Sequence, residues 1–314
     1  MPGAALEDYA APLFIAWQIT AACNLECLHC CEESGHRMPD EMTSEQVLGL
    51  CSQIVDLDIP YVAISGGEPL LHPDFFRVCE FLRAHDRSVK VETNGLFITK
   101  AVAKRLAGLG FRSIQVSVDG AKAATHERLR GTRDWEKTIA ACRYLVREGV
   151  NTEIVFVPTR FNIGEVGQVI DLAASLGIFG VYTGKIMRIG RAAKNWEAIS
   201  PRAEDYEPFF KTLEEKTAEY AGKMKVYYYP YDVIEELRYR LESPAASLLV
   251  LPNGKVKLIG PLPFVCGDLT RQSLEEVWQR YKRSWKLPTV IEYARKVIAR
   301  PSLLAESNRW VELS

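Results

Sequence analysis

Apolar residues along the chain occur in short runs, and longer segments with a helical period of apolar and polar positions separate these runs. The runs are nearly continuous and rich in β-branched residues, which is typical of strands that are covered on both faces. This alternation predicts an α/β fold of βα units around a parallel sheet, as a partial barrel or an open doubly wound sheet. The six runs lie at residues 13–19, 61–67, 89–95, 113–120, 152–158 and 180–187.

The pattern changes after Arg188, where an acidic, helix-like stretch is followed by an aromatic cluster, Tyr227–Tyr231, that we expect in a hairpin. Asn253-Gly254 separates two later apolar runs and predicts another hairpin, because this dipeptide is a strong turn signal. The change in pattern predicts two units with a boundary near residue 222. The expected elements are helices over 201–222, 273–285 and 289–299, in a barrel domain over 12–221 and a small α+β extension over 222–314.

The composition disfavours several classes of partner. A formal net charge of −1 gives no global field that would attract nucleic acid or a membrane surface. No segment approaches the roughly 20 apolar residues that a membrane span needs, and the first residues carry an acidic pair and no long apolar run. We therefore expect a cytoplasmic protein that binds neither nucleic acid nor a membrane.

Four of the eight cysteines fall within nine residues, which indicates metal ligands more than a disulfide framework. Cys23, Cys27 and Cys30 directly follow the first apolar run, so we expect them at the C-terminal end of the first strand, the catalytic rim of α/β barrels. Three thiolates can hold three irons of a [4Fe–4S] cluster and leave the fourth iron open for chemistry. A zinc site is the alternative, with a fourth ligand from His29, Cys31 or His36.

The spacing C-x3-C-x2-C after a first strand resembles the radical S-adenosylmethionine superfamily, and the resemblance extends over about residues 12–220. It implies a partial (β/α)6 barrel of the TIM type, one [4Fe–4S] cluster on the three cysteines, and S-adenosylmethionine chelated by the open iron. It also implies an electron donor of the flavodoxin or ferredoxin type. One electron then cleaves the cofactor into methionine and a 5′-deoxyadenosyl radical, which takes a hydrogen atom from the substrate.

Gly66-Gly67-Glu68-Pro69 ends the second apolar run and is similar to the glycine-rich stretch of this superfamily. The resemblance implies that Gly66, Gly67, Glu68 and Pro69 receive the methionine amino group of the cofactor. Glycine permits a close backbone approach, and a neighbouring carboxylate can accept a hydrogen bond from an ammonium group. Taken alone, the stretch would also suit a simple turn after a strand.

The third and fourth runs end in Thr93-Asn94-Gly95 and Ser117-Val118-Asp119-Gly120, which also match the family pattern. The resemblance also implies that Arg130 pairs with the cofactor carboxylate, and a guanidinium group suits a carboxylate bidentately. Asn-Gly and Asp-Gly are also common turn formers, and Arg130 could be a solvated residue at a helix end. The further cofactor contacts that the resemblance implies are Asn94, Ser117 and Asp119 for ribose or carboxylate, and His29 for adenine.

The segment around the Asn253-Gly254 hairpin resembles the C-terminal SPASM or shorter twitch extension of the superfamily, where a hairpin carries cysteines for a further cluster. The family spacing would put ligands near Leu241 and Ile259, and neither is cysteine. One remaining thiol, Cys266, cannot hold a second cluster, so we expect a degenerate extension and one cluster in the chain. Because a substrate that is oxidised needs an acceptor for its electron, the lack of a second cluster favours a redox-neutral reaction. Cys266 is a candidate hydrogen donor for such a reaction, and the alternative is that it is a buried thiol in a turn.

The substrate is expected to be a small molecule, such as a sugar or aminocyclitol, or a residue of a short peptide, and the reaction an epimerisation or a rearrangement. Only about a dozen residues precede the first run, which favours the small molecule because no leader-binding module is expected there. Alternatives are a peptide maturase that forms a cross-link, a non-catalytic iron–sulfur or zinc scaffold, and an electron-transfer module. Residues expected to border the site are Tyr227–Tyr231, Lys185, Arg188 and Arg191.

Overall fold

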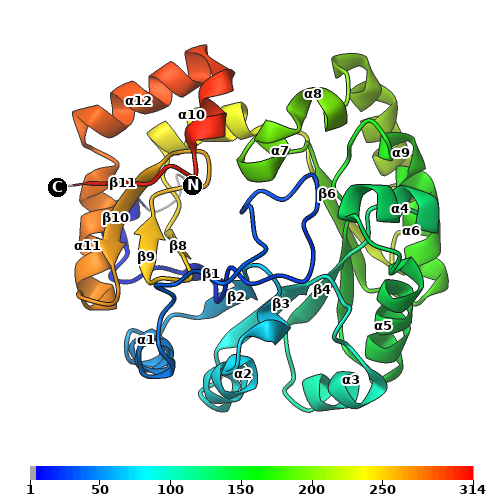
Figure 1. Ribbon diagram of the computed structural model, residues 1–314, viewed down its shortest axis with the longest axis horizontal. Coiled ribbons are helices and arrows are strands. Elements are labelled where there is room, and N and C mark those ends of the chain that lie inside the picture. Colours follow the sequence, from blue (N-terminus) through cyan, green and yellow to red (C-terminus); the bar gives the residue numbers. More distant parts are fainter. Residues whose placement is uncertain (1–4, 314) are drawn as a thin grey trace.

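The computed structural model describes residues 5–313. Its strands form one sheet of eleven strands in the order β11-β10-β9-β8-β1-β2-β3-β4-β5-β6-β7. The sheet curves into an arc, and helices α1, α2, α3, α5 and α6 cover its outer side (Figure 1). The strands are β1 (Phe14–Gln18), β2 (Tyr61–Ser65), β3 (Ser88–Thr93), β4 (Ser113–Ser117), β5 (Thr152–Val155), β6 (Gly180–Gly184), β7 (Lys225–Tyr229), β8 (Ser247–Val250), β9 (Lys255–Lys257), β10 (Phe264–Asp268) and β11 (Val311–Glu312).

Neighbouring strands from β1 to β7 pair in parallel, and each of the six apolar runs supplies one of the first six strands. The sheet ends at β7 and β11, so the barrel is partial and the predicted α/β fold is confirmed. The helices are α1 (Ser44–Asp56), α2 (Phe75–Ala84), α3 (Lys100–Ala107), α4 (Ala123–Arg130), α5 (Trp135–Arg147), α6 (Val166–Ser175), α7 (Gly190–Lys194), α8 (Trp196–Ile199), α9 (Tyr206–Glu219), α10 (Val233–Glu242), α11 (Leu274–Ser284) and α12 (Pro288–Ala299).

Alternate residues of the barrel strands face two different environments, because side chains of a strand point to opposite faces. Ile15 and Trp17 of β1 are fully buried in the apolar core under the helices, whereas Gln18 lies on the inner face. On that inner face Lys90 of β3 and Glu153 of β5 form an ion pair with 3.1 Å between Nζ and Oε2. The inside of the partial barrel is therefore polar, as a ligand-binding space requires.

The sheet continues without a break into the C-terminal residues. β8 pairs in parallel with β1 and antiparallel with β9, so the predicted hairpin at Asn253-Gly254 is confirmed, and Gly254 has the positive φ of 79° that this turn needs. The predicted hairpin at the aromatic cluster is wrong. Tyr227 to Tyr229 belong to the edge strand β7, which pairs in parallel with β6, and Tyr227 stacks on Tyr182 with 4.4 Å between ring centroids.

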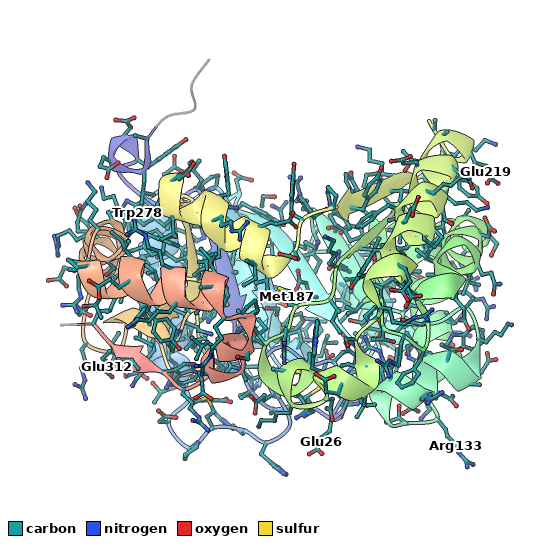
Figure 2. The ribbon with its side chains drawn as sticks, turned by 90° about the horizontal axis from the view of Figure 1, so that it is seen from above. Glu26, Arg133, Met187, Glu219, Trp278 and Glu312 are labelled. Carbon is teal, nitrogen blue, oxygen red and sulfur yellow. The ribbon has the colours of Figure 1, made fainter. Side chains whose placement is uncertain are left out.

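Figure 2 shows the protein from above, with Trp278 and Glu312 of the C-terminal part on one side and Glu219 on the other. Met187, from the segment after β6, lies between these two sides. No helix within residues 5–313 is both long and apolar enough to cross a membrane.

Candidate active site

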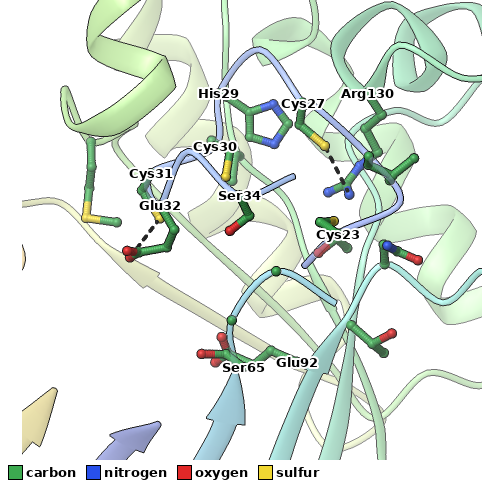
Figure 3. Close-up of a pocket in the computed structure, with 18 of the residues that line it drawn as sticks. Cys23, Cys27, His29, Cys30, Cys31, Glu32, Ser34, Ser65, Glu92 and Arg130 are labelled. Carbon is green, nitrogen blue, oxygen red and sulfur yellow. Dashed lines mark hydrogen bonds between the residues drawn. The ribbon is translucent and has the colours of Figure 1, made fainter. Parts of the chain in front are cut away.

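A pocket opens at the C-terminal ends of the barrel strands, the edge at which parallel sheets bind their ligands. It contains about 920 Å³ of space that is open to solvent. Cys23, Cys27 and Cys30 point toward this common space (Figure 3). The predicted site residues that line it are Cys23, Cys27, His29, Cys30, Gly66, Gly67, Asn94, Ser117 and Arg130.

The three cysteines lie on the loop of residues 19–43, which joins β1 to α1 and crosses the inside of the barrel in Figure 1. The loop is closed on itself by backbone hydrogen bonds from Cys23 N to Gly35 O, at 2.8 Å, and from Gly35 N to Ala21 O, at 3.1 Å. A turn from Cys30 N to Cys27 O, at 3.2 Å, sets the last two thiols beside each other. We call residues 19–43 the cluster loop.

Helix α7 fixes the cluster loop from the other side of the pocket. Arg191 donates from its backbone N–H to Cys30 O at 2.8 Å and from its guanidinium to Cys27 O at 3.2 Å and Ser34 O at 2.6 Å. The preceding Gly190 has a φ of 58°, and a Cβ there would lie 2.0 Å from Cys31 O. Only glycine allows this approach, and Arg191, expected to border the site, supports the loop.

The donor set of the pocket fits an iron–sulfur cluster. Burial raises the pKa of Cys23 to about 11, and burial also raises the pKa of Cys27, against the opposing charge of Arg130. Coordination to iron deprotonates such thiols, and three thiolates leave one iron of a [4Fe–4S] cluster open. Within residues 5–313 no group of three or more His, Cys, Asp or Glu side chains is placed to hold a single metal ion.

The glycine stretch after β2 packs directly against the cluster loop. Gly67 N donates to Thr20 O at 2.7 Å, and Glu68 N donates to Ala22 O at 2.8 Å. A Cβ at Gly66 would lie 2.4 Å from Thr20 O, and one at Gly67 would lie 2.1 Å from Ala22 O. These glycines are therefore needed for the backbone contact as well as for any ligand.

Glu68 and Pro69 are not among the residues that line the pocket, and their contact with the cofactor stays a prediction. The Glu68 carboxylate is fully buried and accepts hydrogen bonds from Thr93 Oγ1 and Asn94 N, each at 2.8 Å. Burial raises its pKa to about 7. Glu68 therefore joins the ends of β2 and β3, and its oxygens are already used. Asn94, which does line the pocket, donates from Nδ2 to Asn24 Oδ1 at 2.8 Å.

Asp119 is also fully buried and does not line the pocket, so its predicted contact with the cofactor is not seen. Its carboxylate accepts from Nε and Nη2 of Arg130, both at 2.8 Å, and lies 3.2 Å from Nε2 of His29. Burial opposes its ionisation, but the charges of Arg130 and His29 outweigh burial and hold the pKa of Asp119 well below its usual range. Two N–H groups of Arg130 are therefore already directed at one oxygen, Oδ2, of Asp119.

Arg130 and His29 face the pocket in the orientation that Asp119 gives them. Nη1 of Arg130 lies 3.9 Å from Cys27 Sγ (Figure 3), which sets a positive charge beside one of the thiols. Nδ1 of His29 has no hydrogen-bond partner among the described residues, although the side chain is only 7% exposed. Both side chains therefore retain polar atoms that are available to a bound group.

Several pocket residues were not predicted. Glu92 lies on the inner face of β3, and burial raises the pKa of its carboxyl group. Glu32 accepts a hydrogen bond from Cys31 Sγ at 3.5 Å, and Ser34 and Ser65 complete the wall. Because side chains alternate between the two faces of β3, Glu92 lies on the same face as Lys90, and this alternation could have identified it as a pocket residue. No local pattern in the sequence indicates that Glu32 lines the pocket.

Cys266 is not brought to the pocket. It lies on β10, is fully buried, and its Sγ donates to Val256 O at 3.4 Å. A hydrogen donor must reach the substrate radical, and Cys266 is buried within a strand and not in the turn of the alternative, so its role as hydrogen donor stays a prediction. Cys51, Cys79 and Cys142 are fully buried on α1, α2 and α5, as expected of small apolar side chains.

Comparison with known proteins supports the same interpretation of the three thiols. Residues 17–173 match the family described as "Radical SAM superfamily", and this is half of the chain. The chain belongs to the radical SAM superfamily. Members of this superfamily use a [4Fe–4S] cluster and S-adenosylmethionine.

Relatives within the radical SAM superfamily differ in chemistry. The mycofactocin maturase MftC of Mycobacterium tuberculosis (strain CDC 1551 / Oshkosh) is 34% identical over 210 residues, which are 66% of this chain and 53% of the maturase. The AdoMet-dependent heme synthase of Methanosarcina barkeri (strain Fusaro / DSM 804) is 27% identical over 292 residues, 86% of this chain and 82% of the synthase. The chain thus spans about half the length of the maturase.

Among solved structures, SuiB of Streptococcus suis with bound S-adenosylmethionine superposes with a TM-score of 0.69. The superposition covers 86% of this chain and 66% of SuiB, at 16% sequence identity. At this identity the likeness shows the shared fold alone, and it supports the partial barrel.

Proposed function

We propose that this radical SAM enzyme holds one [4Fe–4S] cluster on Cys23, Cys27 and Cys30 and removes a hydrogen atom from an organic substrate in a redox-neutral reaction. The observation that carries the proposal is one pocket at the C-terminal strand ends, lined by these three thiols. When bound, the cluster supplies the electron that cleaves S-adenosylmethionine into methionine and the 5′-deoxyadenosyl radical.

The protein residues would orient the two bound groups. Arg191 and the closed cluster loop hold the thiols in one arrangement, which lowers the reorganisation needed on metal binding. Asp119 fixes Arg130, so the remaining guanidinium N–H groups can donate to the carboxylate of S-adenosylmethionine. Gly66 and Gly67 let the opposite wall pack closely against the cluster loop.

The proposal of a redox-neutral reaction depends on where the other thiols lie within residues 5–313. A substrate that is oxidised needs an acceptor for its electron, and Cys51, Cys79, Cys142 and Cys266 are each buried apart from the pocket. We therefore propose a rearrangement in which 5′-deoxyadenosine returns the hydrogen atom to the rearranged substrate radical, or an epimerisation in which a thiol donates the hydrogen atom. The electrons for cofactor cleavage would come from a flavodoxin- or ferredoxin-type protein.

The substrate would be a small molecule of the sugar or aminocyclitol type or a residue of a peptide. A second candidate function, a peptide maturase that forms a cross-link, is favoured by the relative that is named a mycofactocin maturase. The two functions predict different products. A redox-neutral reaction leaves the substrate mass unchanged, whereas a cross-link formed by oxidation removes about two hydrogen atoms for each bond.

Anaerobic reconstitution with iron and sulfide, followed by dithionite and S-adenosylmethionine, tests the central proposal. The wild-type protein should bind about four irons per chain and form 5′-deoxyadenosine. A variant with alanine at Cys23, Cys27 and Cys30 is the control and should form none. If the wild-type protein formed no 5′-deoxyadenosine, with or without candidate substrates, the enzyme proposal would fail, and about eight irons per chain would exclude a single cluster.

A further inference from the structure

A second chamber adjoins the cluster pocket, between the cluster loop and the C-terminal residues 305–310. It contains about 1010 Å³ of space that is open to solvent. Glu32 and Ser34 line both the chamber and the cluster pocket, so a ligand in the chamber would lie directly beside the reaction site. Figure 3 shows these two residues near Cys30 and Cys31.

The outer wall of this chamber is tied to the cluster loop by hydrogen bonds. Asn308 donates from Nδ2 to Cys31 O at 3.0 Å, and its Oδ1 accepts from Nζ of Lys257 at 3.2 Å. Lys257 also donates to Gly260 O at 2.7 Å. The C-terminal segment is therefore held against the cluster loop and forms a built wall.

The lysine and the arginine that line the chamber already have acidic partners, whereas the only hydrogen bond found for the Glu32 side chain among the described residues comes from Cys31 Sγ. Lys194 pairs with Glu33, and Arg309 pairs with Glu306, with 2.6 Å between Nη1 and Oε2. These ion pairs reduce the net charge that the chamber presents to a ligand. Recognition there would accordingly depend on Glu32 and on neutral hydrogen-bonding groups.

Gln18 is the neutral group that stands out. It is only 6% exposed, it lines the chamber, and within residues 5–313 no hydrogen bond of its side-chain amide is found. The amide atoms of Gln18 are not fully buried and so reach the space of the chamber, where they offer both N–H donors and a carbonyl acceptor to a ligand. Trp310 lines the same chamber, and its indole nitrogen lacks a partner among the described residues.

We propose that this second chamber binds an amide group of the substrate, with the Gln18 side chain pairing with its N–H and C=O and Trp310 donating to a further acceptor. The proposal rests on the proposed radical function and names the substrate chemistry for that site. An amide can come from a peptide backbone or from an N-acetylated sugar. In either case the C-terminal extension supplies binding groups in place of cluster ligands.

Saturation-transfer NMR on the reconstituted, oxidised enzyme with S-adenosylmethionine tests this proposal. The probes are N-acetylglycine N-methylamide for the peptide source, N-acetylglucosamine for the sugar source, and glucose as the compound without an amide. At least one amide probe should give a stronger signal than glucose. Gln18→Leu, which keeps the volume, should weaken that signal about five-fold, as expected for losing about one net hydrogen bond.

Trp310→Phe should weaken the same signal, whereas Trp285→Phe, a change in a tryptophan that lines neither space, should not. Iron content and melting temperature identify any variant that fails to fold, and Gln18→Glu then provides a second substitution of similar size. Which amide probe binds identifies the source of the group. Equal signals from all three probes, or amide binding that Gln18→Leu and Gln18→Glu leave unchanged, would overturn the proposal. Failure of the radical function would appear separately, as absence of 5′-deoxyadenosine from the wild-type enzyme.

Discussion

The rim of the barrel and the C-terminal extension both contain cysteine next to a strand, but they use it differently. In the rim, Cys23, Cys27 and Cys30 leave β1 on a loop that turns into the pocket. In the extension, Cys266 lies within β10, where burial raises its pKa to about 12. A thiol on a loop beyond a strand end can hold a metal, whereas a thiol buried within a strand cannot.

The largest effect should come from exchanging one thiol in each region. Cys27→Ser should abolish formation of 5′-deoxyadenosine and reduce the bound iron, because the cluster loses a ligand. Cys266→Ala should retain both and lower the free energy of unfolding by about 1–2 kcal/mol, for the loss of a small buried side chain. Iron counting and product chromatography distinguish the two. Loss of cofactor cleavage in a folded, iron-loaded Cys266→Ala would contradict this comparison.

Buried and exposed ion pairs provide the next contrast. Asp119→Asn removes the carboxylate that faces the buried Arg130 and should lower the free energy of unfolding by about 3–5 kcal/mol. It should also weaken binding of S-adenosylmethionine, because Arg130 loses its orientation. Lys255→Ala, which breaks the exposed pair with Glu312 in the extension, should leave both nearly unchanged. Urea unfolding and equilibrium binding of the cofactor measure these effects, and similar losses in both variants would contradict the contrast.

Two glycines with positive φ extend the comparison to the backbone. Alanine at either position would have to adopt an unfavourable left-handed conformation. At Gly190 the new Cβ would also lie 2.0 Å from Cys31 O, whereas at Gly254 it would lie 2.8 Å from the Thr270 side chain. Gly190→Ala should cost about 3–5 kcal/mol and reduce iron loading. Gly254→Ala should cost about 1–3 kcal/mol and retain iron. Equal iron loading in the two variants would argue against α7 as a support of the cluster loop.

The sequence predicted the parts of the molecule that depend on local spacing. The six barrel strands follow from short apolar runs, and the thiol triad follows from its own spacing and its position after β1. The contact of Arg191 with Cys27 joins residues 164 positions apart, and no local pattern marks such a pair. In the same way, the sequence could suggest Arg130 for the cofactor but could not show that Asp119 holds it.

The two carboxylates that do not line the pocket show a related limit of the sequence. A buried carboxylate at a strand end has the same local sequence whether it faces the pocket or the neighbouring strand. Glu68 and Asp119 both end apolar runs, yet both point away from the pocket toward backbone N–H groups or an arginine. Tyr227 likewise stacks on Tyr182, which belongs to a strand that lies far away in the sequence. Tyr227 is part of an edge strand in the structure, where the sequence predicted a hairpin.

The smallest predicted effect is a pH dependence that distinguishes these two carboxylates. Burial raises the pKa of Glu68 to about 7 from an ordinary 4.5, so the folded protein binds this proton more tightly than the unfolded chain. The stability that this proton contributes is present below about pH 4.5 and is lost as the pH rises through about 7, by at most about 3 kcal/mol. Asp119 has the opposite shift, to well below its usual range, and adds no slope between these values.

Glu68→Gln should remove that slope, because the amide oxygen can still accept from Asn94 N–H while the group no longer titrates. Between about pH 5 and 8 the wild-type protein should lose more free energy of unfolding than the variant, as measured by denaturant midpoints at matched ionic strength. Parallel pH profiles in the two proteins would mean that Glu68 is already ionised at the lower pH. Its hydrogen bonds from Thr93 and Asn94 would then outweigh burial, and Glu68 would resemble Asp119 in remaining charged, with backbone and hydroxyl donors in place of an arginine.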